Sequence, residues 1–268
     1  MSRLDVASIK ADFPILSRHV RDDRPLVYLD SGATSQKPRS VLDAERFYYE
    51  HHNAAAHRGA HQLAEEATIA FEDARRTIAT FIGAESEEVV FTKNATESIN
   101  LLAHAFSSAT AKAAHGRWQG DSRFVLGERD NIVGTINDVG RIAAAARAVG
   151  AFVFLDACQS VPHMPLDVKS LGVDAIAWSG HKMLGPTGIG CLWGTAELLD
   201  AMPPFLTGGS MIETVRMERS TFAKAPQKFE AGVPNIAQAV GLAAAVEYLA
   251  KIGMQRIAEH EHLLTEAA

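Results

Sequence analysis

The sequence predicts an α/β protein with a mostly parallel sheet, and three observations lead to this prediction. Short apolar segments of strand length alternate along the chain with longer segments of helical period. Residues 151–156, AFVFLD, form a continuous apolar run up to the final Asp, which is typical of a strand covered on both faces. The 268 residues are also enough to bury a large core.

The first half of the chain is expected to contain two strands and three helices. LVYLD (26–30) has the character of a short buried strand, and Pro38 then opens a helix to about residue 52. A helix over 65–82 is expected because five apolar residues share one of its faces: Phe71, Ala74, Ile78, Phe81 and Ile82. The strand EEVVFT (87–92) then leads through a turn into an apolar helix, SINLLAHAF (98–106).

The second half of the chain continues the alternation of strands and helices. Small and polar residues at 107–122 predict a loop, and RFVLG after it predicts a strand. Three further strands are expected at 151–156, 174–179 and 188–194, and helices at 138–149, 235–251 and 254–266.

Composition places the chain among soluble globular proteins. A hydrophobic share of 47% with 22% charged residues excludes a disordered tail, a fibre and a membrane bundle. The net charge of −6 comes without a basic block, and no apolar run is long enough to span a bilayer, so we expect no nucleic-acid and no membrane partner. The N-terminus lacks a signal-peptide core, and Cys158 and Cys191 lie in apolar runs, which favours reduced, buried thiols in a cytoplasmic protein.

Polar residues follow three of the expected strands, at the sheet edge where ligands bind in such folds. After the strand 87–92, Asn94 is suited to cap the next helix, with Glu97 closing a capping box. The free amides at such a helix start bind phosphate well, although an ordinary cap has the same sequence. After the strand 151–156, Asp156 faces a dry cleft, where a protonated pyridine nitrogen would suit it. A simple capping role is the alternative for Asp156.

The third strand end carries the sequence SGHKMLGPTG, with Lys182 between an apolar strand and a glycine-rich turn. Desolvation there would lower the pKa of the lysine and free its amine as a nucleophile toward a carbonyl. Ser179 and His181 can donate hydrogen bonds to a phosphate beside it, whereas the alternative is a surface turn. Together, the phosphate cradle, the pyridinium partner and the Schiff-base lysine are what pyridoxal 5′-phosphate (PLP) requires.

Longer blocks around these residues resemble the class V aminotransferase family, PLP fold type I, and within it the SufS-type cysteine desulfurases. The matching blocks are YLDSGATSQKP, HRGAH, VVFTKNATESINLLA, FVFLDACQSVPHMPLDV, WSGHKMLGPTGIG, PPFLTGGSMIETV and FEAGVPNIAQAVGLAAAVEYL. The resemblance implies a three-layer large domain with a seven-stranded-type, mostly parallel sheet, here lacking strands. It divides the chain into an N-terminal segment (1–25), the PLP-binding domain (26–250) and the start of a truncated C-terminal domain (251–268).

The resemblance also implies which residues bind the cofactor. Lys182 would form the Schiff base and later move the proton, Asp156 would pair with the pyridine nitrogen, and Gln159 would bind the ring hydroxyl. The remaining expected ligands hold the phosphate: Thr96, Ser179, His181 and the backbone amide of Ala95.

Candidate substrate residues follow from the same resemblance. Ala33 and Thr34 would lie on the substrate side of the cofactor. His57 and Arg58 would come near the active site of the second subunit of a homodimer. Asn131 matches either the asparagine that meets the substrate carboxylate or the start of a segment that is missing here. No metal site is expected, because His57 and His61 have helical pair spacing without a third ligand.

The chain departs from the family pattern at three places. Val233 replaces a threonine whose hydroxyl reaches the cofactor phosphate of the partner subunit. A segment that carries the histidine stacked on the pyridine ring is missing near residues 130–131. The chain ends at Ala268, before the part that carries the persulfide cysteine, and neither Cys158 nor Cys191 is a substitute. Either the gene product is shortened, or these residues are the ordered pieces of a longer chain.

The activity implied is PLP-dependent conversion of L-cysteine, or a related amino acid, to L-alanine. Its sulfur would pass to an acceptor protein of iron–sulfur cluster assembly (the SUF system), with turnover impaired in the chain as it stands. A selenocysteine lyase or another class V aminotransferase is the alternative enzyme, since the cysteine-bearing part would decide between them. A non-catalytic dimerising scaffold is the third hypothesis, which the Val233 substitution favours.

Overall fold

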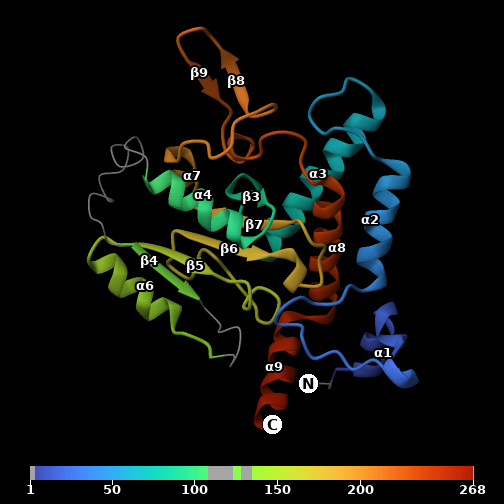
Figure 1. The fold of residues 1–268 in the computed structure, drawn as a ribbon. Helices are drawn as coiled ribbons and strands as arrows, with labels where there is room; N and C mark the ends of the chain where they lie inside the picture. Colours follow the sequence, from blue (N-terminus) through green and yellow to red (C-terminus); the bar gives the residue numbers. More distant parts are fainter. Residues whose placement is uncertain (1–3, 108–122, 128–134, 268) are drawn as a thin grey trace.

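The computed structural model describes residues 4–107, 123–127 and 135–267, and its centre is a five-stranded mixed sheet (Figure 1). The strand order is β3-β7-β6-β5-β4. The strands are β3 (Val89–Thr92), β4 (Arg123–Gly127), β5 (Phe152–Asp156), β6 (Ala175–Ser179) and β7 (Gly190–Gly194). Strands β4, β5 and β6 are parallel, whereas β7 is antiparallel to both of its neighbours. The α/β class is therefore confirmed.

Strands β3, β5, β6 and β7 are buried because their side chains are mostly apolar on both faces. Every residue of β3, β6 and β7 is buried, and so is every residue of β5 except the terminal Asp156. Such strands can carry polar groups only where they end, because a polar side chain within them would have to be desolvated. The sheet therefore confines its chemistry to the strand ends.

Helices surround this sheet (Figure 1). Helix α4 (Ala95–Ser107) packs on β6 and β7, and α6 (Val139–Ala148) packs on β5. Helices α2 (Arg39–His51) and α3 (Gln62–Phe81) both pack against the Ala-rich α8 (Ile236–Ile252), which continues into α9 (Met254–Ala267). Within the described ranges, no single helix is long and apolar enough to cross a membrane, although the bent pair α8 and α9 meets that test together.

The smaller elements lie outside the main sheet. They are α1 (Val6–Ala11), α7 (Ala196–Ala201), the pair β1 (His19–Val20) and β2 (Arg24–Pro25), the hairpin β8 (Ile212–Val215) and β9 (Ser220–Phe222), and the 3₁₀ turns η1 (Pro14–Ser17), η2 (Arg21–Asp23), η3 (Ser86–Glu88), η5 (Gly180–Lys182) and η6 (Gln227–Phe229). The β8–β9 hairpin projects from the body of the molecule (Figure 1). These elements are too short to show a hydrophobic period, and so the sequence did not predict them.

The predicted strand at 26–30 is wrong. These residues form no strand, and the side chains of Val27 and Leu29 are 76% and 91% exposed. Their apolar character is that of a strand, but no strand of the five-stranded sheet pairs with them. The predicted loop at 107–122 falls almost entirely outside the described residues.

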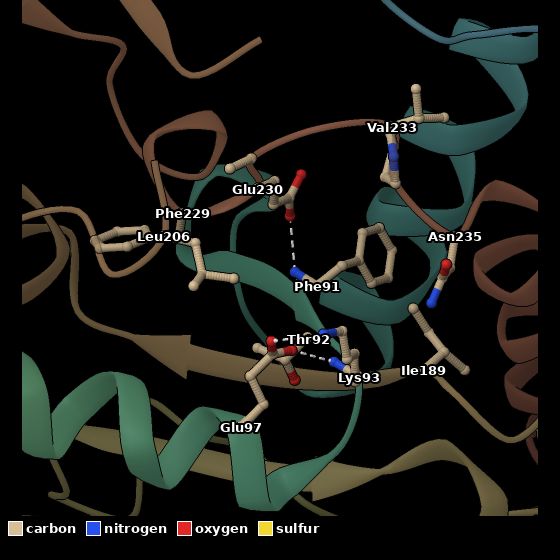
Figure 2. A pocket seen from close by; sticks show the side chains of 12 residues that line it. Phe91, Thr92, Lys93, Glu97, Ile189, Leu206, Phe229, Glu230, Val233 and Asn235 are labelled. Carbon is tan, nitrogen blue, oxygen red and sulfur yellow. Dashed lines mark hydrogen bonds and ion pairs between the residues drawn. The ribbon is translucent and has the colours of Figure 1, made fainter. Parts of the chain in front are cut away.

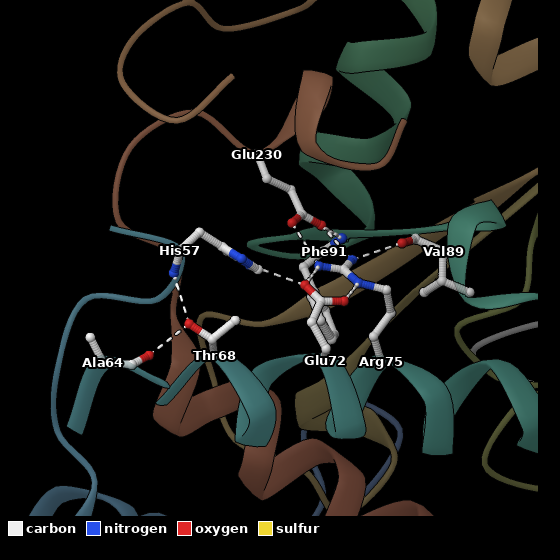
Figure 3. A network of polar contacts seen from close by, with 8 residues as sticks. All are labelled: His57, Ala64, Thr68, Glu72, Arg75, Val89, Phe91 and Glu230. Carbon is white, nitrogen blue, oxygen red and sulfur yellow. Dashed lines mark hydrogen bonds and ion pairs between the residues drawn. The ribbon is translucent and has the colours of Figure 1, made fainter. Parts of the chain in front are cut away.

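A buried arginine connects helix α3, strand β3 and the segment after η6 (Figure 3). The guanidinium of Arg75 is 1% exposed and donates to both carboxylate oxygens of Glu230, at 2.7 and 2.8 Å. It also donates to the Val89 carbonyl at 2.8 Å and to the Glu72 carboxylate at 2.9 Å. One Glu230 oxygen in addition accepts the Phe91 N–H at 2.7 Å. The segment 230–235 is thereby attached to the end of β3.

Replacing Arg75 with leucine is expected to lower the free energy of unfolding by about 3–5 kcal/mol, because Glu230 would keep a buried charge without its partner. The matched control is Arg76→Leu, since Arg76 is 65% exposed in its ion pair with Asp73 and should contribute less than about 1 kcal/mol. Urea unfolding of the three proteins measures both differences. Equal losses from the two substitutions would contradict the structural role of Arg75.

Candidate active site

The candidate site begins where β5 and β6 end side by side. The two strands are parallel, and Asp156 at the end of β5 pairs in register with Ala177, two residues before Ser179. The Asp156 carboxylate accepts the backbone N–H of Cys158 at 3.0 Å, and this bond holds it at the mouth of the strand. The turn η5 follows Ser179 directly and carries Lys182. The structure thus places the predicted acid and the predicted amine on adjacent strand ends.

Ser179 joins these strand ends to the start of helix α4. Its hydroxyl oxygen accepts the Ala95 N–H at 3.0 Å and lies 3.7 Å from the Cys158 sulfur. An N–H at a helix N-terminus next to a hydroxyl is suited to an anion, which would replace the hydroxyl oxygen as the acceptor of that N–H. Thr96 is exposed in the first turn of the same helix. Ala95, Thr96 and Ser179, predicted separately as phosphate ligands, therefore lie together.

The cap of α4 differs in one detail from the prediction. Asn94 caps the helix as expected, because its side-chain oxygen accepts the Glu97 N–H at 3.0 Å. The Glu97 carboxylate, however, accepts the N–H of Lys93 at 2.6 Å rather than that of Asn94. The capping box is therefore displaced by one residue, and it closes the turn between β3 and α4.

The turn that carries Lys182 is short and tightly folded. The Gly180 carbonyl accepts the N–H groups of both Met183 and Gly185 at 3.0 Å, and Leu184 between them has φ = +66°. A Cβ atom at Gly185 would come within 2.9 Å of the Gly180 oxygen, so only glycine fits there. These hydrogen bonds fix the shape of the turn, whereas its position in the molecule depends on contacts with neighbouring segments.

Burial and neighbouring charges shift two groups beside Lys182. Burial, followed by the Asp156 carboxylate, raises the pKa of the Cys158 thiol to about 12. Burial lowers the pKa of His181, and the cations Lys37 and Lys182 lower it further. At neutral pH, Cys158 is therefore a thiol and His181 a neutral imidazole that can donate one N–H.

The other predicted residues form two further groups. Gln159 is buried and donates to the Gly32 carbonyl at 2.9 Å, so it holds the segment that contains Ala33 and Thr34. Ala33 is exposed, whereas the Thr34 hydroxyl donates to the His181 carbonyl at 3.3 Å. Asn131 lies outside the described residues.

His57 and Arg58 belong to a different part of the fold. His57 has φ = +61° and contacts Glu72 at 3.1 Å, next to the Arg75 network (Figure 3). Arg58 donates to the Ser210 hydroxyl at 2.8 Å and crosses Gly209, where a Cβ atom would meet its guanidinium at 1.8 Å. His57 and His61 do not form a helical pair, because His61 is the N-cap of α3 and His57 precedes it in a turn.

Val233 lies at a pocket beside the β3–α4 turn (Figure 2). The pocket is lined on one side by Phe91, Lys93 and Glu97 and on the other by the segment 229–235. The Val233 side chain is 63% exposed, and so it is free to meet another surface.

Two further residues lie at the site without having been predicted from the sequence, Ser35 and Lys37. Both contact the carbonyl of His181, the residue before Lys182. They lie in the block YLDSGATSQKP, which contributed to the resemblance, but nothing in the local pattern predicts a contact between residues so far apart in the chain.

Comparisons with known proteins show to which family the chain is similar. The family model "Aminotransferase class-V" matches residues 27–116 and 124–268. A "Probable cysteine desulfurase" of Streptomyces coelicolor is 50% identical over 99% of this chain and 75% of its own length. A "Cysteine desulfurase" of Haloferax volcanii is 43% identical over 99% of this chain and 76% of its own length. The apo structure of a cysteine desulfurase from Thermococcus onnurineus NA1 superposes with a TM-score of 0.87 at 32% identity, covering 100% of this chain and 76% of that one.

The alignment with the Streptomyces relative also bears on the missing segment. It extends over 315 residues, more than the 268 of this chain, so the relative has residues inside the aligned stretch that this chain lacks. The predicted gap near 130–131 lies outside the described residues.

The raised pKa of Cys158 predicts that this thiol resists alkylation while the chain is folded. With a pKa of about 12 instead of 9.0, it holds about 1000-fold less thiolate at pH 8 than an ordinary cysteine. Iodoacetamide labelling followed by peptide mass spectrometry measures this at several pH values, with the chain unfolded in urea as the control in which both cysteines react. Rapid labelling of Cys158 in the folded chain at pH 8 would contradict the assignment.

Proposed function

The chain belongs to the cysteine desulfurases of the class V aminotransferase family, and we propose that its site binds PLP and acts on L-cysteine, releasing L-alanine. The observation that supports this best is the meeting of Asp156, Ser179, Lys182 and the Ala95 N–H at adjacent strand and helix ends. An amine, a carboxylate and an anion site are what a phosphorylated pyridine aldehyde requires.

The donor set fits the cofactor group by group. Lys182 would supply the amine that holds the aldehyde carbon, and Asp156 would keep the ring nitrogen protonated. The Ser179 hydroxyl, the Ala95 N–H, Thr96 and the neutral His181 imidazole would bind the phosphate. Gln159 would bind the ring hydroxyl beside the segment it already holds. When bound, PLP supplies an electron sink for the carbanion next to the substrate amine.

The side chains of the site would also transfer and donate protons. With cofactor and substrate bound, the Lys182 amine would take a proton from the substrate α-carbon and return it elsewhere. Burial, Lys37 and Lys182 lower the pKa of His181, so its imidazole is neutral in the unliganded chain and can donate one N–H to the phosphate.

The sulfur acceptor is not either cysteine of this chain. Cys158 is buried next to Asp156, and Cys191 is buried within β7; burial raises the pKa of both thiols. A persulfide acceptor has to be a mobile thiolate, and neither residue meets that requirement. We therefore propose that the 268-residue polypeptide holds PLP but releases alanine from L-cysteine slowly, and that sulfur for iron–sulfur cluster assembly leaves through a separate acceptor protein.

A homodimer is part of the proposal. Large apolar side chains on several segments are exposed in the single chain, among them Val27, Leu29, Val215, Met217 and Val233. A monomer seldom exposes so many, and burial against a second copy would remove them from water. The same arrangement would bring His57 and Arg58 to the partner's site.

The spectrum of the protein with PLP tests the cofactor proposal. We expect a visible-edge absorbance band that Lys182→Ala abolishes, whereas Lys169→Ala, at an exposed ion pair with Glu85, leaves it unchanged. Alanine release is then measured with L-cysteine and with L-selenocysteine. Release from selenocysteine alone would favour a lyase, and the absence of any Lys182-dependent band would favour the non-catalytic scaffold.

Replacing Val233 with threonine is expected to tighten PLP binding by about tenfold, because the new hydroxyl can donate to the phosphate of the partner subunit. The exposed Val149→Thr at the end of α6 is the matched control. Retention of PLP during dialysis measures the difference. If both variants lose PLP as fast as the unmodified chain, the segment 230–235 does not reach a cofactor phosphate.

A further inference from the structure

Residues 28–38, here called the strap, pass next to the turn that carries Lys182. The strap has no helix or strand of its own before α2. Its polar groups bond instead to the candidate site, beginning with Gln159, which donates to the Gly32 carbonyl at 2.9 Å. Within the strap, the Tyr28 hydroxyl donates to the Thr34 carbonyl at 2.5 Å. The conformation of the strap is therefore fixed by hydrogen bonds to the candidate site and within the strap itself.

Four donors of the strap converge on one carbonyl, that of His181. Ser35 contributes two of them, its N–H at 2.8 Å and its hydroxyl at 2.9 Å. The Thr34 hydroxyl at 3.3 Å and the Lys37 ammonium at 3.4 Å are longer and weaker. A buried carbonyl needs only one donor to be satisfied, so this convergence constrains the peptide well beyond that need.

Ser35 holds the turn on both sides of Lys182. Its hydroxyl oxygen also accepts the Leu184 N–H at 2.8 Å, and the residue is only 5% exposed. One buried hydroxyl thus connects the peptide before Lys182 to the residue two positions after it. Leu184 has φ = +66°, a conformation that a leucine keeps only when its surroundings impose it.

Lys37 reinforces the same peptide from a half-buried position. Its ammonium donates to the Ser35 carbonyl at 2.5 Å as well as to the His181 carbonyl. Burial lowers the pKa of Lys37, and the facing Glu45 carboxylate opposes that effect. The charge of Lys37 in turn contributes to the lowered pKa of His181.

We propose that the strap is a positioning device for Lys182, with Ser35 as its principal residue and Lys37 as a secondary one. This inference rests on the proposed function, in which the Lys182 amine reacts with an aldehyde. The lysine side chain has four rotatable bonds, so its amine is delivered accurately only if the backbone at residue 182 is held. An error of about 1 Å in such a position costs up to about 100-fold in rate.

Covalent capture of Lys182 by PLP tests the proposal. The full chain is freed of cofactor with hydroxylamine and mixed with PLP at several concentrations. The Lys182 amine condenses with the aldehyde and releases water. Borohydride then supplies a hydride that reduces the carbon–nitrogen double bond to a stable single bond. Peptide mass spectrometry follows labelling at Lys182 and, as an internal control, at the exposed Lys169. The variants are Ser35→Ala and Lys37→Met, with Ser17→Ala as the matched control, because Ser17 makes a comparable bond to the Pro14 carbonyl in an exposed turn.

Ser35→Ala is expected to lower the maximal rate of capture at Lys182 about tenfold, and Lys37→Met about threefold. The PLP concentration that gives the half-maximal rate should change far less than the maximal rate, because the part of the phosphate cradle at Ser179 and the Ala95 N–H is held by contacts other than those of the strap. Labelling of Lys169, and all rates in Ser17→Ala, should equal those of the unmodified chain.

Three outcomes would overturn the proposal or its premise. Unchanged maximal rates in both variants would show that the strap does not position Lys182. A rise in the half-maximal PLP concentration together with a lower melting temperature would show general loosening instead of positioning. If Ser35→Ala does not fold, Lys37→Met alone decides. A failure of the proposed function is distinguishable, since Lys182 of the unmodified chain would then be captured no faster than Lys169.

Discussion

The register between β5 and β6 is the constraint on which the rest of the site depends. Because Asp156 pairs with Ala177, the two parallel strands end within two residues of each other at one edge of the sheet. All residues of β6, and all of β5 before Asp156, are buried, so polar side chains are tolerated only at that edge. A shift of one residue would turn Asp156 to the other face and separate it from the turn of Lys182.

Irregular segments are then attached to this edge by single buried polar groups. Ser179 attaches the start of α4, Arg75 attaches the segment that contains Val233, and Ser35 attaches the strap. Each is buried, and each must find partners because water is excluded. The apolar core supplies most of the stability, but these few polar contacts decide where the loops of the site lie.

The same burial that organises the site makes its thiols unreactive. Cys158 lies among Asp156, Ser179 and Lys182, yet desolvation and the adjacent carboxylate keep it protonated. A thiol of this kind can pack against the cofactor pocket without competing for the aldehyde or for sulfur. Sulfur transfer therefore requires a thiolate in a more exposed and more electropositive setting, and the two cysteines of this chain provide none.

Much of the fold and the central site residues could be predicted from the sequence, because the information is local. Apolar periods marked the strands β3 to β7 and the long helices, and the residues after those strands included Asp156, Ser179 and Lys182. Where a prediction needed a distant partner, it was wrong or missing. LVYLD has the residues of a strand, but no strand of the five-stranded sheet pairs with it. Arg75 has the polarity of a surface residue, but it is buried in an ion pair with Glu230.

The sequence by itself determined the α/β class and the cofactor chemistry, and it predicted Lys182 as the reacting amine. Only the tertiary structure decided that Ser35 and Lys37 hold the peptide before Lys182, across 146 and 144 residues of chain. The reason is physical: strand and helix patterns record which face of a segment avoids water, whereas a hydrogen bond between distant segments leaves no periodic trace in either of them.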